Sequence, residues 1–180
     1  MRSFALLLAI TAVAPAQTKT TWEEYPGYVL SSGAIDVTVL STGGTIASVV
    51  LTSDKDKLNP LWDPIRFARE TGAANRRGPG AGIGHFLCVD GFGPISKEEA
   101  AAGMNGHGEA HRQDFETKLA RTQNGAQTLT LETELPLLQE RLTRTYEVRQ
   151  GENVVYVRSQ LQSLVAFDRP LVWAEHATIG

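Results

Sequence analysis

A two-residue alternation of apolar and polar side chains runs through the second half of the chain. In residues 127–135, Leu129, Leu131 and Leu135 occupy one face and polar side chains occupy the other. Residues 139–149 repeat the pattern, and a Val- and Tyr-rich run at 154–164 follows a Gly-containing turn. Successive side chains of a strand point to opposite faces, so the pattern predicts consecutive antiparallel hairpins. We therefore expect an all-β fold built on a large antiparallel sheet.

The first half adds strands and a less regular middle. Residues 28–40 predict one or two strands, and residues 46–51 predict another after the turn Thr42-Gly43-Gly44. Residues 63–84 contain several glycines and two prolines, which predicts an irregular surface segment. The Gly-rich run at 78–84 could be taken for a phosphate-binding loop, but no predicted strand precedes it and no helix follows.

A short helix is predicted at residues 96–104. Ser96 stands at the N-cap and Glu99 at the third helical position, which is the capping-box pattern.

The first sixteen residues have the pattern of a secretory signal peptide. Arg2 precedes an apolar run from Phe4 to Ala14, and Ala14-Pro15-Ala16 has the spacing of a cleavage site. The run is too short to span a bilayer as a helix, and no long apolar run follows it. We expect a mature chain that begins near Gln17 and is periplasmic or secreted, with no membrane partner after cleavage. The alternative is a buried N-terminal helix.

Residues 17–180 have the length of one domain, and their composition excludes some classes of partner. A formal net charge of −3 argues against a nucleic-acid partner, which would require a basic surface. Cys88 is the only cysteine, so the chain cannot form an internal disulfide. Its apolar neighbours indicate a small core residue, with a catalytic thiol as the alternative.

Three of the four histidines fall in two short stretches about seventy residues apart. Histidine changes charge near neutral pH, so its presence among polar neighbours indicates a proton-transfer or ligand site. In the first stretch, residues 103–112, the glycines beside His107 would let a ligand approach the backbone. Arg112 offers planar donors for hydroxyl or carboxylate oxygens. The alternatives are a polar turn, or a metal site formed by His107, Glu109 and His111 on one face of an extended segment.

The second stretch is a strand-like run at 170–178 that contains His176. Trp173 could stack on the apolar face of a sugar while the hydroxyls of the sugar form hydrogen bonds. In a regular strand Glu175 and His176 point to opposite faces, so only one of them can face a ligand. The alternative is a core histidine whose nitrogens are bonded to backbone.

These motifs together resemble a known family. The motifs are a Leu-x-Thr-Gly-Gly-x-Ile hairpin at 40–46, Asn59-Pro60-Leu61-Trp62, His107-Gly108 followed by Arg112, and the strand that ends in His176. Their succession over most of residues 28–180 resembles the aldose 1-epimerase, or galactose mutarotase-like, superfamily. The resemblance implies an antiparallel β-supersandwich whose sheet face binds a sugar.

The resemblance also assigns roles to single residues. His107 and Arg112 correspond to sugar-binding positions, with Arg112 displaced by one residue. His176 corresponds to the general acid, although Ala177-Thr178 follows it where the family has proline and an aromatic residue. The general base of the family is a glutamate much nearer its C-terminus, and no residue here matches it.

The sequence thus predicts an exported carbohydrate-binding protein that resembles aldose 1-epimerase. The resemblance implies that the full-length protein interconverts sugar anomers by general acid–base catalysis without a cofactor. We expect residues 17–180 to be the N-terminal portion of a single, C-terminally truncated β-sandwich domain, inactive by itself. Two alternatives stay open. One is a non-catalytic carbohydrate-binding module, and the other is a metal-dependent enzyme that uses His107, Glu109 and His111.

Overall fold

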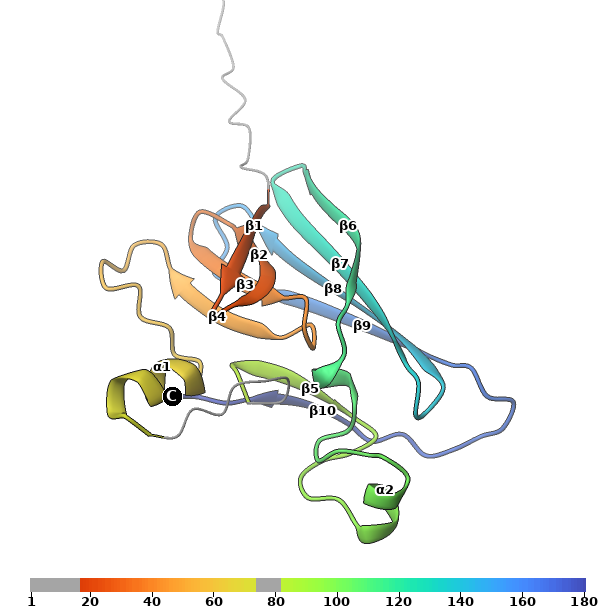
Figure 1. Cartoon of the computed structure of the whole chain (residues 1–180). Coiled ribbons are helices and arrows are strands. Elements are labelled where there is room, and N and C mark those ends of the chain that lie inside the picture. Colours follow the sequence, from red (N-terminus) through yellow and green to blue (C-terminus); the bar gives the residue numbers. More distant parts are fainter. Residues whose placement is uncertain (1–16, 74–81) are drawn as a thin grey trace, which may run out of the picture.

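Two antiparallel β-sheets make up most of the molecule (Figure 1). The computed structural model describes residues 17–73 and 82–180. The predicted signal peptide at 1–16 and residues 78–81 of the Gly-rich run lie outside the described residues.

The larger sheet has six strands, in the order β1-β2-β3-β4-β5-β10. Their bounds are β1 Thr18–Trp22, β2 Tyr25–Ser31, β3 Ile35–Leu40, β4 Ile46–Leu51, β5 His85–Val89 and β10 Trp173–Ala177. The four-stranded sheet follows chain order, with β6 Glu116–Gln123, β7 Ala126–Leu135, β8 Glu140–Arg149 and β9 Tyr156–Ser163.

The strands predicted from alternation are confirmed. Along β8, Leu142, Tyr146 and Val148 are fully buried, as is Arg144 on the same face. The side chains of the opposite face, Thr143, Thr145 and Glu147, are partly exposed. The tight turn between β3 and β4 depends on Gly43 and Gly44, whose φ angles are +71° and +55°. Alternation did not predict β1, β5 or β6, because β1 and β6 are mostly polar and β5 is apolar without alternation.

The hydrophobic core lies between the two sheets. The six-stranded sheet contributes Leu30, Val37, Val39, Leu87 and Val89, and the four-stranded sheet contributes Leu129, Leu131, Leu142, Tyr146 and Val148. Each fully buried leucine or valine stabilises such a fold by roughly 1.5–3 kcal/mol relative to exposure. The β-sandwich predicted from the sequence is thus the observed architecture.

The helices correct one expectation and confirm another. Residues 64–71, expected to be irregular, form α1 (Pro64–Thr71). Asp63 caps its N-terminus, and Gly72 ends it at φ +70°. Ser96 and Glu99 form the predicted capping box of α2 (Lys97–Ala101). A 3-10 helix, η1, covers Ala110–Arg112.

None of the helices formed by residues 17–73 and 82–180 has both the length and the apolar character that a membrane crossing requires.

Candidate functional site

Strands β5 and β10 pair along their whole length, although their first residues, His85 and Trp173, are far apart in the sequence. This pairing places His176 beside Phe86. Because strand side chains alternate, the pair has two faces. One face bears Leu87, Val89 and Trp173 and packs against the core between the sheets. We call it the inner face, and the opposite face, which carries Phe86 and His176, the outer face.

Five rings gather on the outer face. We call them the histidine cluster: Phe86, Phe92, His107, His111 and His176. Phe86 stacks on His176 with ring centroids 4.5 Å apart and planes 15° from parallel. The His107 ring is perpendicular to the His176 ring, with centroids 5.4 Å apart. His107 and His176, named from the sequence as a binding residue and an acid, are therefore neighbours in space.

A close backbone contact brings His107 to this position. Gly108 bridges to Val89 at the end of β5, and a Cβ on Gly108 would lie 1.8 Å from the Val89 carbonyl oxygen. Only glycine fits there. His107 itself has φ +68°, an uncommon conformation for a residue with a side chain. Strained backbone of this kind concentrates at functional sites.

The histidines of the loop are held in their uncharged form. Burial and the nearby Arg112 lower the pKa of His111 to about 4. Burial, with a smaller contribution from His176, lowers the pKa of His107. The Nδ1 atom of His176 lies 3.2 Å from the Thr178 hydroxyl, and the His176 ring is only partly buried. His176 is therefore not a core histidine bonded to backbone.

The inner face has a different chemistry. Arg144 of β8, which is fully buried, donates two hydrogen bonds to the Glu175 carboxylate, at 3.0 and 3.1 Å. The Nε–H of Arg144 donates to the Tyr146 hydroxyl, which donates in turn to the Gly44 carbonyl. His85 Nε2 lies 3.3 Å from the same carboxylate. Glu175 therefore ties β10 to the opposite sheet and points away from His176.

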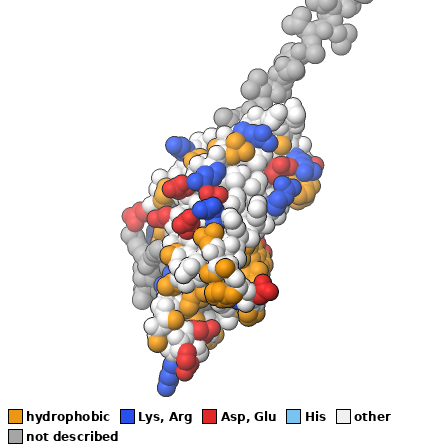
Figure 2. Space-filling model, turned by 90° about the vertical axis from the view of Figure 1, so that its right-hand side faces the viewer, with side chains coloured by type: hydrophobic (Ala, Val, Ile, Leu, Met, Phe, Trp, Pro, Cys, Tyr) orange, Lys and Arg blue, Asp and Glu red, His pale blue; other side chains and the backbone are white. Residues whose placement is uncertain are grey.

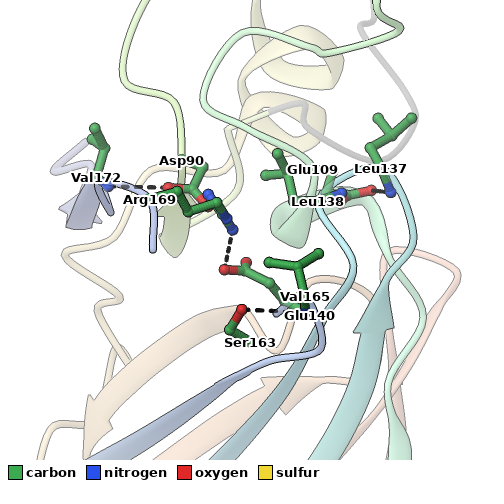
Figure 3. A network of polar contacts seen from close by, with 9 residues as sticks. All are labelled: Asp90, Glu109, Leu137, Leu138, Glu140, Ser163, Val165, Arg169 and Val172. Carbon is green, nitrogen blue, oxygen red and sulfur yellow. Dashed lines mark hydrogen bonds and ion pairs between the residues drawn. The ribbon is translucent and has the colours of Figure 1, made fainter. Parts of the chain in front are cut away.

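A second polar network joins the connections around β5, β8 and β10 (Figure 3). Arg169 donates to Asp90 at 2.7 Å and also to Glu140. The Glu109 carboxylate accepts hydrogen bonds from the Leu137 and Leu138 amides. These contacts hold the loop after β5, the β7–β8 turn and the segment before β10 in place.

The geometry proposed for a metal site is wrong. His107 is in a left-handed turn, Glu109 faces the amides of the β7–β8 turn, and His111 lies in a 3-10 helix, so the segment is not extended. Across the described residues, no three His, Cys, Asp or Glu side chains are grouped so that they could hold a metal ion.

The other two residues named from the sequence do not join the rings. Trp173 is partly buried and packs against the core from the inner face. Arg112 is exposed, and its Nε–H donates to His111 Nε2 at 3.3 Å, so it contacts the cluster through His111.

Two aromatic residues of the histidine cluster were not predicted from the sequence. Phe86 is buried beneath His176, and Phe92 is 61% exposed with its ring 5.7 Å from His107 and 5.9 Å from His176. Phe92 lies between Gly91 and Gly93 in a loop, which is a common setting for an exposed binding residue.

The face shown in Figure 2 carries two kinds of surface. Acidic and basic side chains alternate over its upper part, and apolar side chains gather lower down. The strands of the smaller sheet contribute exposed ion pairs such as Lys118–Glu116 and Arg141–Glu134. The segment between β9 and β10 carries exposed Leu164, Phe167, Leu171 and Val172.

Comparison with solved structures identifies the architecture. YeaD from Salmonella typhimurium, a suspected mutarotase, aligns over 78% of this chain with a TM-score of 0.51 and 18% identity. A galactose mutarotase-like protein from Lactobacillus casei aligns over 75% with a TM-score of 0.51 and 16% identity. The chain has a galactose mutarotase-like fold. It spans 45% and 43% of the length of those two mutarotase-like chains. No protein-family model matches the sequence, and no curated protein is detectably similar to it.

Proposed function

We propose that this protein binds a free sugar, an aldose or the end of a glycan, on the outer face of β5 and β10. The observation that carries the proposal is the histidine cluster on a mutarotase-like fold. A sugar has apolar ring faces and a rim of hydroxyl groups. Phe92 offers an exposed ring for stacking, and His107 and His176 offer ring nitrogens for hydrogen bonds beside it.

We further propose that a site completed by a general base interconverts the anomers of this sugar. His176 would give a proton to the ring oxygen while a base takes the proton of the anomeric hydroxyl. The bond between the anomeric carbon and the ring oxygen breaks and leaves an aldehyde, rotation exposes its other face, and the reverse transfers close the ring. Neither an oxidant nor a cofactor enters this balance.

Glu175 does not supply the general base. Glu175, the carboxylate next to His176 in sequence, is on the inner face and bonded to Arg144. It cannot reach a sugar on the outer face without losing those bonds. The same observation favours a second candidate function, a carbohydrate-binding module that holds a sugar without turning it over.

Polarimetry with a freshly dissolved single anomer tests the proposal and separates the two candidates. Mutarotase activity predicts a faster approach to the equilibrium rotation, and the His176→Asn variant should lower the catalysed rate by roughly 10²–10⁴-fold. Saturable binding in calorimetry without a faster rotation would support the binding module. If neither binding nor rate enhancement is seen with any common aldose, both candidates are wrong.

We also propose that the protein is exported with cleavage after Ala16. N-terminal sequencing of protein from its native host should find Gln17 or a close neighbour as the first residue. Intact Met1 on cytoplasmic protein would contradict this.

A further inference from the structure

The Nδ1 atom of His107 faces two hydrogen-bond donors. The backbone amide nitrogen of Gly93 lies 3.3 Å away, and the Cys88 sulfur lies 3.5 Å away. The two donors come from different elements, because Cys88 belongs to β5 and Gly93 to the loop that follows. Cys88 is fully buried and adjoins His107 on the outer face.

This arrangement determines where His107 carries its proton. A backbone N–H can only donate, so it must meet a ring nitrogen with a free lone pair. A neutral imidazole has one such nitrogen and one N–H. With Nδ1 occupied as an acceptor, the proton of neutral His107 resides on Nε2.

Cys88 supports the same assignment. Burial raises the pKa of its thiol to about 11, so the sulfur keeps its hydrogen at neutral pH. A thiol beside an unprotonated ring nitrogen donates to it, although weakly. Burial also lowers the pKa of His107, which keeps the ring neutral.

We propose that Cys88 and the Gly93 amide act as positioning groups that fix His107 in its neutral form with the proton on Nε2. His107 then presents a hydrogen-bond donor and no basic nitrogen. Resting on the proposed sugar site, this makes His107 a donor to a lone pair of a sugar oxygen. It leaves proton transfer to His176, whose ring centroid is 5.4 Å away.

Nitrogen-15 NMR of the whole chain at neutral pH, without sugar, tests the proposal. The His107 signals, identified by their loss in a His107→Gln variant, should show an unprotonated Nδ1 and a protonated Nε2. A proton on Nδ1, or a mixture of tautomers, would overturn the assignment. No sugar is present, so failure of the proposed function would leave this result intact.

Two variants of Cys88 test how much its thiol contributes to the pKa of His107. Cys88→Ala removes a donor to the neutral ring and should raise the pKa of His107 by about half a unit. Cys88→Ser keeps a donor and should leave that pKa near the wild-type value. If both variants titrate like wild type, Cys88 has no positioning role. If Cys88→Ala does not fold, the wild-type spectrum and the Cys88→Ser titration still decide the tautomer and whether a donor at this position suffices.

Discussion

Adjacent residues of β10 belong to two chemically different environments. Glu175, on the inner face, is held by two hydrogen bonds from a fully buried arginine. His176, on the outer face, touches aromatic rings and a single hydroxyl group. An ion pair holds the inner face, whereas ring packing and single hydrogen bonds to ring nitrogens hold the outer face.

The difference shows how a sheet can separate stability from function. Alternation sends neighbouring side chains to opposite faces, so the network of Arg144 can anchor β10 without contacting the histidine cluster. The rings of that cluster are held by packing and by backbone contacts from the loops after β5. Changes on the inner face should therefore alter folding first, and changes on the outer face should alter sugar binding first.

The largest expected effect comes from breaking the inner face. Glu175→Gln leaves the buried Arg144 charge without its carboxylate. Because the Glu175 side chain is 36% exposed, the free energy of unfolding should fall by about 3 kcal/mol, the lower end of the range for a fully buried pair. Urea unfolding followed by circular dichroism measures this loss. Replacing both partners, with Arg144→Met and Glu175→Leu, should restore most of it, because no buried charge then remains.

The matched control is an exposed ion pair in the four-stranded sheet, which also carries Arg144. Arg141 contacts Glu134 at 2.9 Å on the surface, and Arg141→Gln should leave the unfolding curve unchanged. Equal stability of the Glu175→Gln and Arg141→Gln proteins would mean that Arg144 does not anchor β10.

The second largest effect is expected from lowering the pH, because protonation of His111 on the outer face should destabilise the folded chain. The pKa of His111 is lowered from 6.5 to about 4 in the folded chain. As the pH falls from 6.5 towards 4, His111 therefore binds a proton in the unfolded chain but stays neutral in the folded chain. This histidine contributes stability above pH 6.5 that is lost towards pH 4, about 3 kcal/mol in all.

Other groups change protonation in the same pH range, so a His111 variant is needed to separate the contribution of His111 from theirs. The pKa of His85 is also lowered by burial, whereas burial raises the pKa of Glu109 and of Glu140, which acts in the opposite sense. The difference in unfolding free energy between wild type and His111→Leu isolates His111. A difference that is constant from pH 7 to pH 4 would show that His111 is not held neutral.

A smaller effect is expected from the backbone contact that supports the outer face. Gly108→Ala places a Cβ 1.8 Å from the Val89 carbonyl oxygen, and relieving this clash should cost roughly 1–3 kcal/mol. Sugar binding should weaken as well, because His107 adjoins Gly108. Gly33→Ala is the control, since Gly33 also has a positive φ but a Cβ there meets open space. Thermal unfolding that ranks the two variants equally would argue against the clash.

The smallest effect should be confined to ligand affinity. Phe92→Ala removes an exposed ring, and we expect sugar affinity to fall about tenfold with little change in the melting temperature. Titration calorimetry of the wild-type and Phe92→Ala proteins with sugar measures this change in affinity. Unchanged affinity would remove Phe92 from the site.

The alternation of the sequence was sufficient to predict the β7–β9 hairpins and the sandwich. It could not predict β5, whose run His85–Val89 is apolar on both faces because the sheet covers one and the rings cover the other. Helix α1 was overlooked although Asp63, Pro64 and Gly72 carry ordinary start and stop signals. Its surroundings, rich in glycine and proline, favoured a loop.

The site was predicted in part for a similar reason. Histidine can change charge near neutral pH, so its residue type alone indicates a candidate site, and three histidines, His107, His111 and His176, meet in the cluster. The partners Phe86 and Phe92 depend on the long-range pairing of β5 with β10, which local patterns do not reveal. The same pairing shows that Trp173 shares the inner face with Glu175, a relation that the two-residue spacing already contained.

NMR mapping of sugar binding is the most direct test of whether the outer face of β5 and β10 is a sugar site. On titration of the labelled chain with a free aldose, we expect saturable shifts for the side-chain signals of Phe92, His107 and His176. The signals of Trp173 and Arg144 on the inner side should stay in place. Shifts at Trp173 with unmoved histidines, or no saturable shift on the outer face with any aldose, would mean that the outer face is not the sugar site.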